Sequence, residues 1–168
     1  MIFSLILSFF MFSFDGFTSN YLSFNIFNYS FFTTNYSIIA LSIIYPLFNN
    51  DKKYIITSTI MGLLFDIVYT NTFIFNAVIF FLIAIFIKFI YNYLSENILG
   101  YILVSLLAVV LYYILTFSLL TTLGHINFEI IILLKKLVSI LPMTIIVSLI
   151  LALLIKLLER KKILKQVK

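Results

Sequence analysis

The sequence predicts an all-α integral membrane protein, a single domain built as a bundle of about six transmembrane helices. Of its 168 residues, 64% are hydrophobic and only 10% are charged, and the mean hydropathy is +1.21. A soluble domain has about 45–50% apolar and about 25% charged residues. A globule of this size cannot bury so much apolar surface, so the excess must face lipid. The chain has no cysteine, which excludes a disulfide framework and thiolate chemistry.

The apolar segments follow one another along the chain with short polar breaks. The first, 1–17, is interpreted as a retained helix because it lacks a basic leader and a small-residue cleavage site. The stretch 17–36 carries no charged residue and is rich in Ser, Asn, Tyr and Phe, which favours an interfacial or partly re-entrant loop. The further helices are expected at 35–49, 54–70, 73–91, 98–123 and 137–158.

The basic residues predict the orientation of the bundle. With six helices, Lys52, Lys53, Lys88 and the basic tail 159–168 fall on one side, which the positive-inside rule makes cytoplasmic, together with both termini. Lys135 and Lys136 fall on the other side, where we expect them to belong to a short interfacial helix, Phe128 to Leu134, and to snorkel. Anionic lipids are the expected partners of the tail, and nucleic acid is not. The tail bases are Arg160, Lys161, Lys162, Lys165 and Lys168.

Asp66 is the most informative single residue, because an acid inside an apolar span is costly. Ser58, Gly62 and Asp66 recur at every fourth position, so they share one face of a helix that we expect to pack closely on a neighbour. Asn76 follows the turn by the same number of residues as Asp66 precedes it, which predicts a contact between the two. These four residues form either a polar clasp that fixes the hairpin or a substrate or proton site. We favour the clasp.

Two further helices carry small and polar residues on one face, a pattern typical of helix packing in lipid. In 98–123 the face also includes Tyr101 and Ala108, and in 137–158 it begins after Pro142. A polar cavity lined by the tyrosines is the alternative. The residues expected to pack are Ser105, Tyr112, Thr116, Thr144, Ser148 and Ala152.

No pattern for catalysis is present in the sequence. His125 is the sole histidine, and with Glu129 it makes a poor metal site and no triad. Nucleotide-binding loops, HExxH and GxSxG are absent, and the acids are scattered. We therefore expect a protein that is not an enzyme and that needs no metal or cofactor.

The hairpin carries a motif: Gly62-Leu63-Leu64-Phe65-Asp66, a turn, and then Phe75-Asn76-Ala77. With the short first helix, the polar loop, the long fifth helix and the basic C-terminus, it resembles the MreD family of bacterial rod shape-determining membrane proteins. That family often has glycine two residues before the Asn, where this chain has Ile74. The resemblance covers nearly the whole chain in length and layout.

The resemblance implies a non-catalytic scaffold of the cell-elongation machinery in the bacterial cytoplasmic membrane, which helps to organise lateral peptidoglycan synthesis. Its implied partners are a bitopic MreC-like protein and, through it, MreB, RodA and a class B penicillin-binding protein. The alternative is a substrate-binding membrane subunit resembling the capture component of energy-coupling factor transporters. That family couples to its partner through small residues on the first helix, to which Ser4-xxx-Ser8 is the nearest analogue.

Overall fold

Six helices account for most of the chain in the computed structural model, which describes residues 2–21, 25–26, 29–30, 35–70, 72–124 and 129–166. Side chains are described for 4–18, 35–70, 72–124 and 129–157. The helices are α1 (Ile2–Tyr21), α2 (Tyr36–Ile44), α3 (Asp51–Phe65), α4 (Phe75–Tyr91), α5 (Ile98–Thr122) and α6 (Ile130–Gln166). A 3-10 turn, Tyr45–Leu47, ends α2, and a π-helical turn, Asp66–Thr70, ends α3. Two short strands, β1 (Asn25–Ile26) and β2 (Tyr29–Ser30), pair antiparallel.

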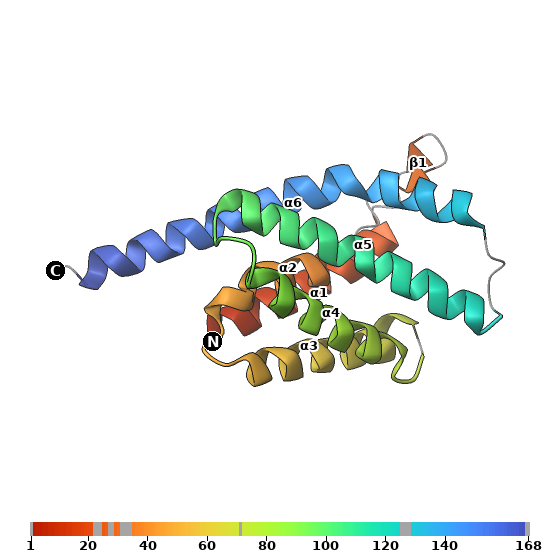
Figure 1. Ribbon diagram of the computed structural model, residues 1–168, viewed down its shortest axis with the longest axis horizontal. Coiled ribbons are helices and arrows are strands. Elements are labelled where there is room, and N and C mark those ends of the chain that lie inside the picture. The colour runs from red at the N-terminus through yellow and green to blue at the C-terminus, as the bar shows by residue number, and fades with distance from the viewer. Residues whose placement is uncertain are drawn as a thin grey trace.

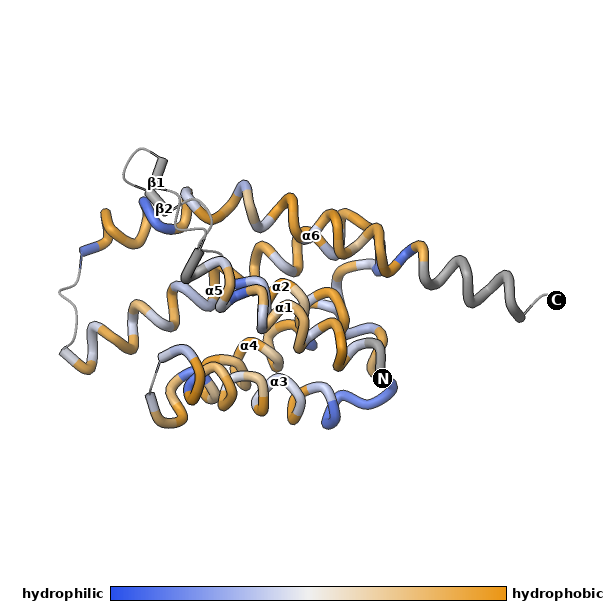
Figure 2. The backbone as a smooth tube through the Cα atoms, turned by 180° about the vertical axis from the view of Figure 1, so that it is seen from behind, coloured by the Kyte–Doolittle hydropathy of each residue, from blue (hydrophilic) through white to orange (hydrophobic). Residues whose placement is uncertain are grey.

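Consecutive helices run back and forth between two ends of the bundle (Figure 1). We call one the basic end, because it holds the start of α3 with Lys52 and Lys53, the end of α4 with Lys88, and the last turns of α6. The other is the hairpin end, where α3 meets α4. Figure 2 shows hydrophilic residues at the start of α3 and mostly hydrophobic residues along the helices. The relative placement of these bases at one end agrees with the expectation from the sequence.

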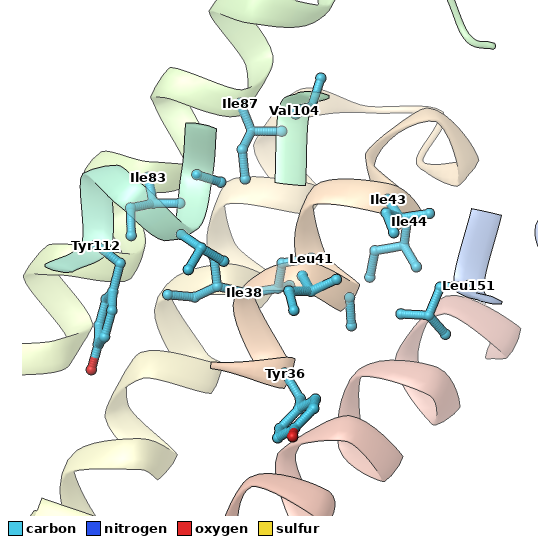
Figure 3. Packing of buried hydrophobic residues seen from close by; sticks show 14 of the residues in the cluster. Tyr36, Ile38, Leu41, Ile43, Ile44, Ile83, Ile87, Val104, Tyr112 and Leu151 are labelled. Carbon is cyan, nitrogen blue, oxygen red and sulfur yellow. The ribbon is translucent and has the colours of Figure 1, made fainter. Parts of the chain in front are cut away.

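The short helix α2 forms the centre of the bundle. All nine of its residues are buried, and α1, α4, α5 and α6 pack around it. Figure 3 shows Ile38 and Leu41 of α2 facing side chains such as Ile83 of α4 and Val104 of α5. A mostly apolar helix can face either lipid or protein, and here it is enclosed by protein. The sequence of α2, with six aliphatic residues in nine, is suited to this position.

Because α2 ends inside the protein, the carbonyl groups of its last turn need partners there. The Tyr54 hydroxyl of α3 donates to the Leu41 carbonyl over 3.2 Å, and the Tyr91 hydroxyl of α4 donates to the Ser42 carbonyl over 2.9 Å. Two tyrosines from separate helices therefore complete the C-terminal end of α2. The N-terminal end is completed by a carboxylate, described below.

Several helix boundaries differ from those expected. α1 continues through Tyr21, so the stretch 17–36 is helical in its first part. A separate interfacial helix before Lys135 is wrong: α6 is one helix from Ile130, because the run of Ile and Leu holds no glycine or proline that would end it. α6 also continues to Gln166, so the basic tail extends this helix over those residues. Pro142 lies within it.

The described part of the molecule has an unusually apolar exterior around a mainly apolar core that also holds buried polar side chains. Large apolar side chains are exposed along α1, α3, α4, α5 and α6, for example Ile67 at 73%, Leu99 at 74% and Leu157 at 60%. By length and composition, α5 and residues Ile130–Leu157 of α6 could each cross a membrane. At nine residues, or about 14 Å, α2 is shorter than the ~30 Å of a hydrocarbon core. The buried polar side chains include Ser4, Ser8, Asp15, Ser58, Asp66, Asn76, Ser105, Thr144 and Ser148.

Candidate functional site

The Asp66 carboxylate joins the end of α3 to the start of α4. Its Oδ1 accepts from the backbone N–H of Asn76 at 2.9 Å, from the Asn76 side-chain amide at 3.0 Å and from the Thr72 hydroxyl at 2.5 Å. Its Oδ2 accepts from the backbone N–H of Ala77 at 3.1 Å. The contact between Asp66 and Asn76 that the sequence spacing predicts is therefore present. We call this group the Asp66 clasp.

The clasp replaces the cap that α4 lacks. Ile74 precedes the helix and has no oxygen in its side chain with which to accept the N–H groups of the first turn. Asp66 supplies that acceptor from the neighbouring helix, and its negative charge lies at the positive end of the α4 dipole. Ile74 has φ of 68°, a left-handed conformation that is a strained outlier for a β-branched residue.

A second carboxylate, Asp15 of α1, does the same for α2. Its Oδ1 accepts from the Tyr36 backbone N–H at 2.7 Å, and its Oδ2 accepts from the backbone N–H and the hydroxyl of Ser37. The next N–H, that of Ile38, donates to the Asn35 side chain at 3.1 Å. Asp15 is only 5% exposed. We call this the Asp15 clasp; sequence reasoning missed it, although an acid in an apolar segment was the available signal.

Two tyrosines connect the clasps to each other and to α5. Tyr69, in the π-helical turn after Asp66, donates its hydroxyl to the Phe12 carbonyl over 2.7 Å. Its ring lies against Gly16, where a Cβ would come within 2.6 Å of the ring. The Tyr112 hydroxyl of α5 lies 3.3 Å from Asn76 Oδ1, to which it donates. The first four helices and α5 thus meet in one polar layer near the hairpin end.

The small residues of α3 allow the close approach that the clasp needs. A Cβ on Gly62 would lie 2.7 Å from the Ala77 Cα, 2.7 Å from the Asn76 carbonyl oxygen and 2.9 Å from the Phe80 Cβ. Two of these atoms belong to the backbone, so α4 would have to move. Ser58, one turn earlier on the same face, is 1% exposed.

The polar faces of the last two helices point inward. On α5, Ser105 is fully buried and Tyr112 is 8% exposed, whereas Thr116 is partly exposed. On α6, Thr144, Ser148 and Ala152 are fully buried. Thr144 and Ser148 donate their hydroxyls to carbonyl groups of their own helix. Their polar atoms are thereby paired, and these small side chains can pack against neighbouring helices.

At the basic end, one ion pair links α3 and α4. Lys88 Nζ lies 2.9 Å from Asp51 Oδ2, and the Tyr45 hydroxyl donates to Asp51 Oδ1 over 3.0 Å. The hydrogen bonds from Lys88 and Tyr45 lower the pKa of Asp51 below its ordinary value. Both partners of the pair are more than two fifths exposed, so it contributes little to stability.

Some of the expected residues lie outside the described part of the structure. His125 and Lys168 are among them, as are the side chains of Arg160, Lys161, Lys162 and Lys165. Within the described residues, no three acidic or histidine side chains gather as a metal site would require. The chemistry available at the clasps is that of hydrogen-bond acceptors, each directed at a helix N-terminus of this chain.

Comparison with known proteins identifies no relative: no family model, no curated protein and no solved structure matches the chain.

Proposed function

We propose that the chain is a multi-pass membrane protein that serves as a non-catalytic scaffold, of the kind that MreD provides in bacterial cell elongation. Membrane insertion is supported by the apolar exterior, where many isoleucine, leucine and phenylalanine side chains are exposed, while serines, threonines and two aspartates are among the buried residues. In lipid, small and polar residues hold helices together, and apolar residues face outward. In this proposal the basic end is cytoplasmic.

The observation that carries the scaffold proposal is that both carboxylate oxygens of Asp66 accept hydrogen bonds from this chain. Asn76 and Thr72 occupy one carboxylate oxygen, and the Ala77 N–H binds the other. The Asp66 carboxylate is thereby bound both to the turn after α3 and to the first turn of α4. Its role in the proposal is to hold α4 against α3, which is what a scaffold with a fixed shape requires.

The implied partners remain those of the resemblance: a bitopic MreC-like protein and, through it, MreB, RodA and a class B penicillin-binding protein. The partner would contact the outer apolar faces of the bundle, since Gly62 and Asp66 are enclosed. Neither clasp would touch it directly.

The alternative, a capture subunit of an energy-coupling factor transporter, has less support. Ser4 and Ser8, the analogue of its coupling motif, are 1% and 2% exposed and so face the interior. The polar layer near Tyr112 is its remaining argument. Both carboxylate oxygens of Asp66, however, already accept hydrogen bonds from backbone N–H groups of this chain.

The test is a pull-down of the tagged full-length protein from its own host in mild detergent, with partners identified by mass spectrometry. Recovery of a bitopic MreC-like protein with cell-wall synthases supports the scaffold. Recovery of ATP-binding-cassette ATPases instead would overturn it and favour the capture subunit. The control variant is Asp51→Asn, which changes an exposed residue at the basic end and should recover the same partners as the wild type.

A further inference from the structure

Two lysines interrupt the apolar surface of α6 near the hairpin end. Lys135 is exposed, and Lys136 is partly buried, with its Nζ 5.9 Å from the centre of the Tyr113 ring on α5. The helix on either side is apolar and exposed, with Leu134 at 54% and Val138 at 67%. A cation in such a surface is costly unless an anion or water meets it.

The spacing of charge along α6 indicates where these lysines would lie in a membrane. The 19 residues 137–155, between Lys136 and Lys156, carry no charge. As a helix they are about 28 Å long, close to the ~30 Å of a hydrocarbon core. If the proposed membrane placement holds, Lys156 reaches the headgroups at the basic end, and Lys135 and Lys136 reach those at the hairpin end.

The charges near this position leave an excess of positive charge. Glu129 is exposed just before the start of α6, about 10 Å along the helix axis from Lys136. The α6 N-terminus itself is a positive dipole end, with no acid in its first turn. Asp15 and Asp66, in the same half of the bundle, are engaged in their clasps.

We propose that Lys135 and Lys136 bind the phosphate of an anionic phospholipid headgroup at the hairpin end of the bundle. This rests on the membrane placement in the proposed function. Lys135 reaches outward to the phosphate, whereas Lys136, lying over Tyr113, supplies a cation held against α5. The sequence-based expectation that these lysines only snorkel to water is the competing explanation.

The test uses the full-length protein in phosphatidylcholine nanodiscs that contain a minor fraction of phosphatidylglycerol. Native mass spectrometry counts the phosphatidylglycerol that stays bound on release. The variants are Lys135→Gln, the double change Lys135→Gln with Lys136→Gln, and the charge-preserving pair Lys135→Arg with Lys136→Arg. We expect the double Gln variant to bind phosphatidylglycerol more weakly by on the order of tenfold, the single variant by less, and the Arg pair as wild type.

The outcomes separate this inference from the function on which it rests. If wild-type protein fails to enter nanodiscs, the membrane placement fails. If the Gln variants insert and retain as much phosphatidylglycerol as wild type, the lipid site is wrong and the lysines only snorkel. Inorganic phosphate, added to protein in neutral detergent, tests a free anion as the ligand: saturable binding lost in the single Gln variant, which leaves Lys136 in place, would overturn the lipid assignment.

Discussion

Asp15 and Asp66 have equivalent roles. Each carboxylate lies in the later part of one helix and accepts hydrogen bonds from two successive backbone N–H groups in the first turn of the next helix. Asp15 receives those of Tyr36 and Ser37, and Asp66 receives those of Asn76 and Ala77. Both aspartates are at most 5% exposed. Helix N-termini inside an apolar environment leave unpaired N–H donors. One carboxylate satisfies two of them, and its negative charge interacts favourably with the positive end of the helix dipole.

Replacing Asp66 with Asn should destabilise the fold. Asn has one acceptor oxygen and no charge, so the N–H of Ala77 or of Asn76 loses its partner. Hydrogen bonds to charged groups contribute about 1.5–3 kcal/mol each, and we expect a loss of that order. Thermal unfolding of the purified protein in detergent and its abundance in the membrane both report this.

Asp15→Asn should behave like Asp66→Asn, and Asp51→Asn should change little because Asp51 is exposed. Wild-type stability and abundance of Asp66→Asn, combined with complete loss of function, would contradict the clasp and favour a ligand or proton site.

Gly62→Ala should separate α3 from α4. The added Cβ would lie 2.7 Å from the Ala77 Cα, which is backbone and cannot rotate away. We expect a loss of about 1–3 kcal/mol, typical of overpacking, and lower abundance. Leu63→Ala, at a neighbouring position that is 38% exposed, is the matched control and should have a small effect. Equal stability of the two variants would show that the helices do not approach so closely.

Ile74→Gly should stabilise the protein. Ile74 has φ of 68°, which costs a β-branched residue about 1–3 kcal/mol and costs glycine almost nothing. Its side chain is 42% exposed, so little packing is lost. We expect a higher unfolding temperature. Val78→Gly, at an exposed position inside α4, should lower it instead; a lower unfolding temperature for both variants would argue against strain at Ile74.

The Asp51–Lys88 pair gives the basic end a weak dependence on pH. The pKa of Asp51 is lowered in the folded protein, so its contribution is present above the ordinary value of 3.8 and is lost as pH falls through the lower folded value. For an exposed pair we expect about 0.5 kcal/mol. Lys88→Met should reduce this dependence in unfolding measurements between about pH 5 and about pH 2, a range that brackets the titration of Asp51. An unchanged pH profile would show that the pair contributes nothing.

Cysteine labelling tests the proposed orientation, and the chain offers a clean background because it has no cysteine. Phe73→Cys places a thiol at the hairpin end, where Phe73 is 90% exposed, and Tyr93→Cys places one at the basic end, where Tyr93 is 74% exposed. A membrane-impermeant maleimide should label the first in intact cells and the second only after permeabilisation. Labelling of both from outside would contradict opposite placement of the two ends.

How much of the site could be predicted depended on sequence separation. Asp66 and Asn76 are ten residues apart across a tight turn, so their spacing places them at one depth. Asp15 and Tyr36 are 21 positions apart along the uncharged stretch, and no periodicity relates them. The enclosure of α2 was also out of reach, because an apolar run has the same composition whether it faces lipid or protein.

The sequence by itself determined the helical, apolar character of the chain, the hairpin with Asp66 and the grouping of Lys52, Lys53 and Lys88, because composition and short-range periodicity specify these. The tertiary structure alone decided that α2 is the buried centre and that Asp15 completes its first turn. It also decided that α6 continues through Lys135 and Lys136 without a break. These features depend on which helices are neighbours, and that is settled by packing and by the pairing of buried polar groups across long separations.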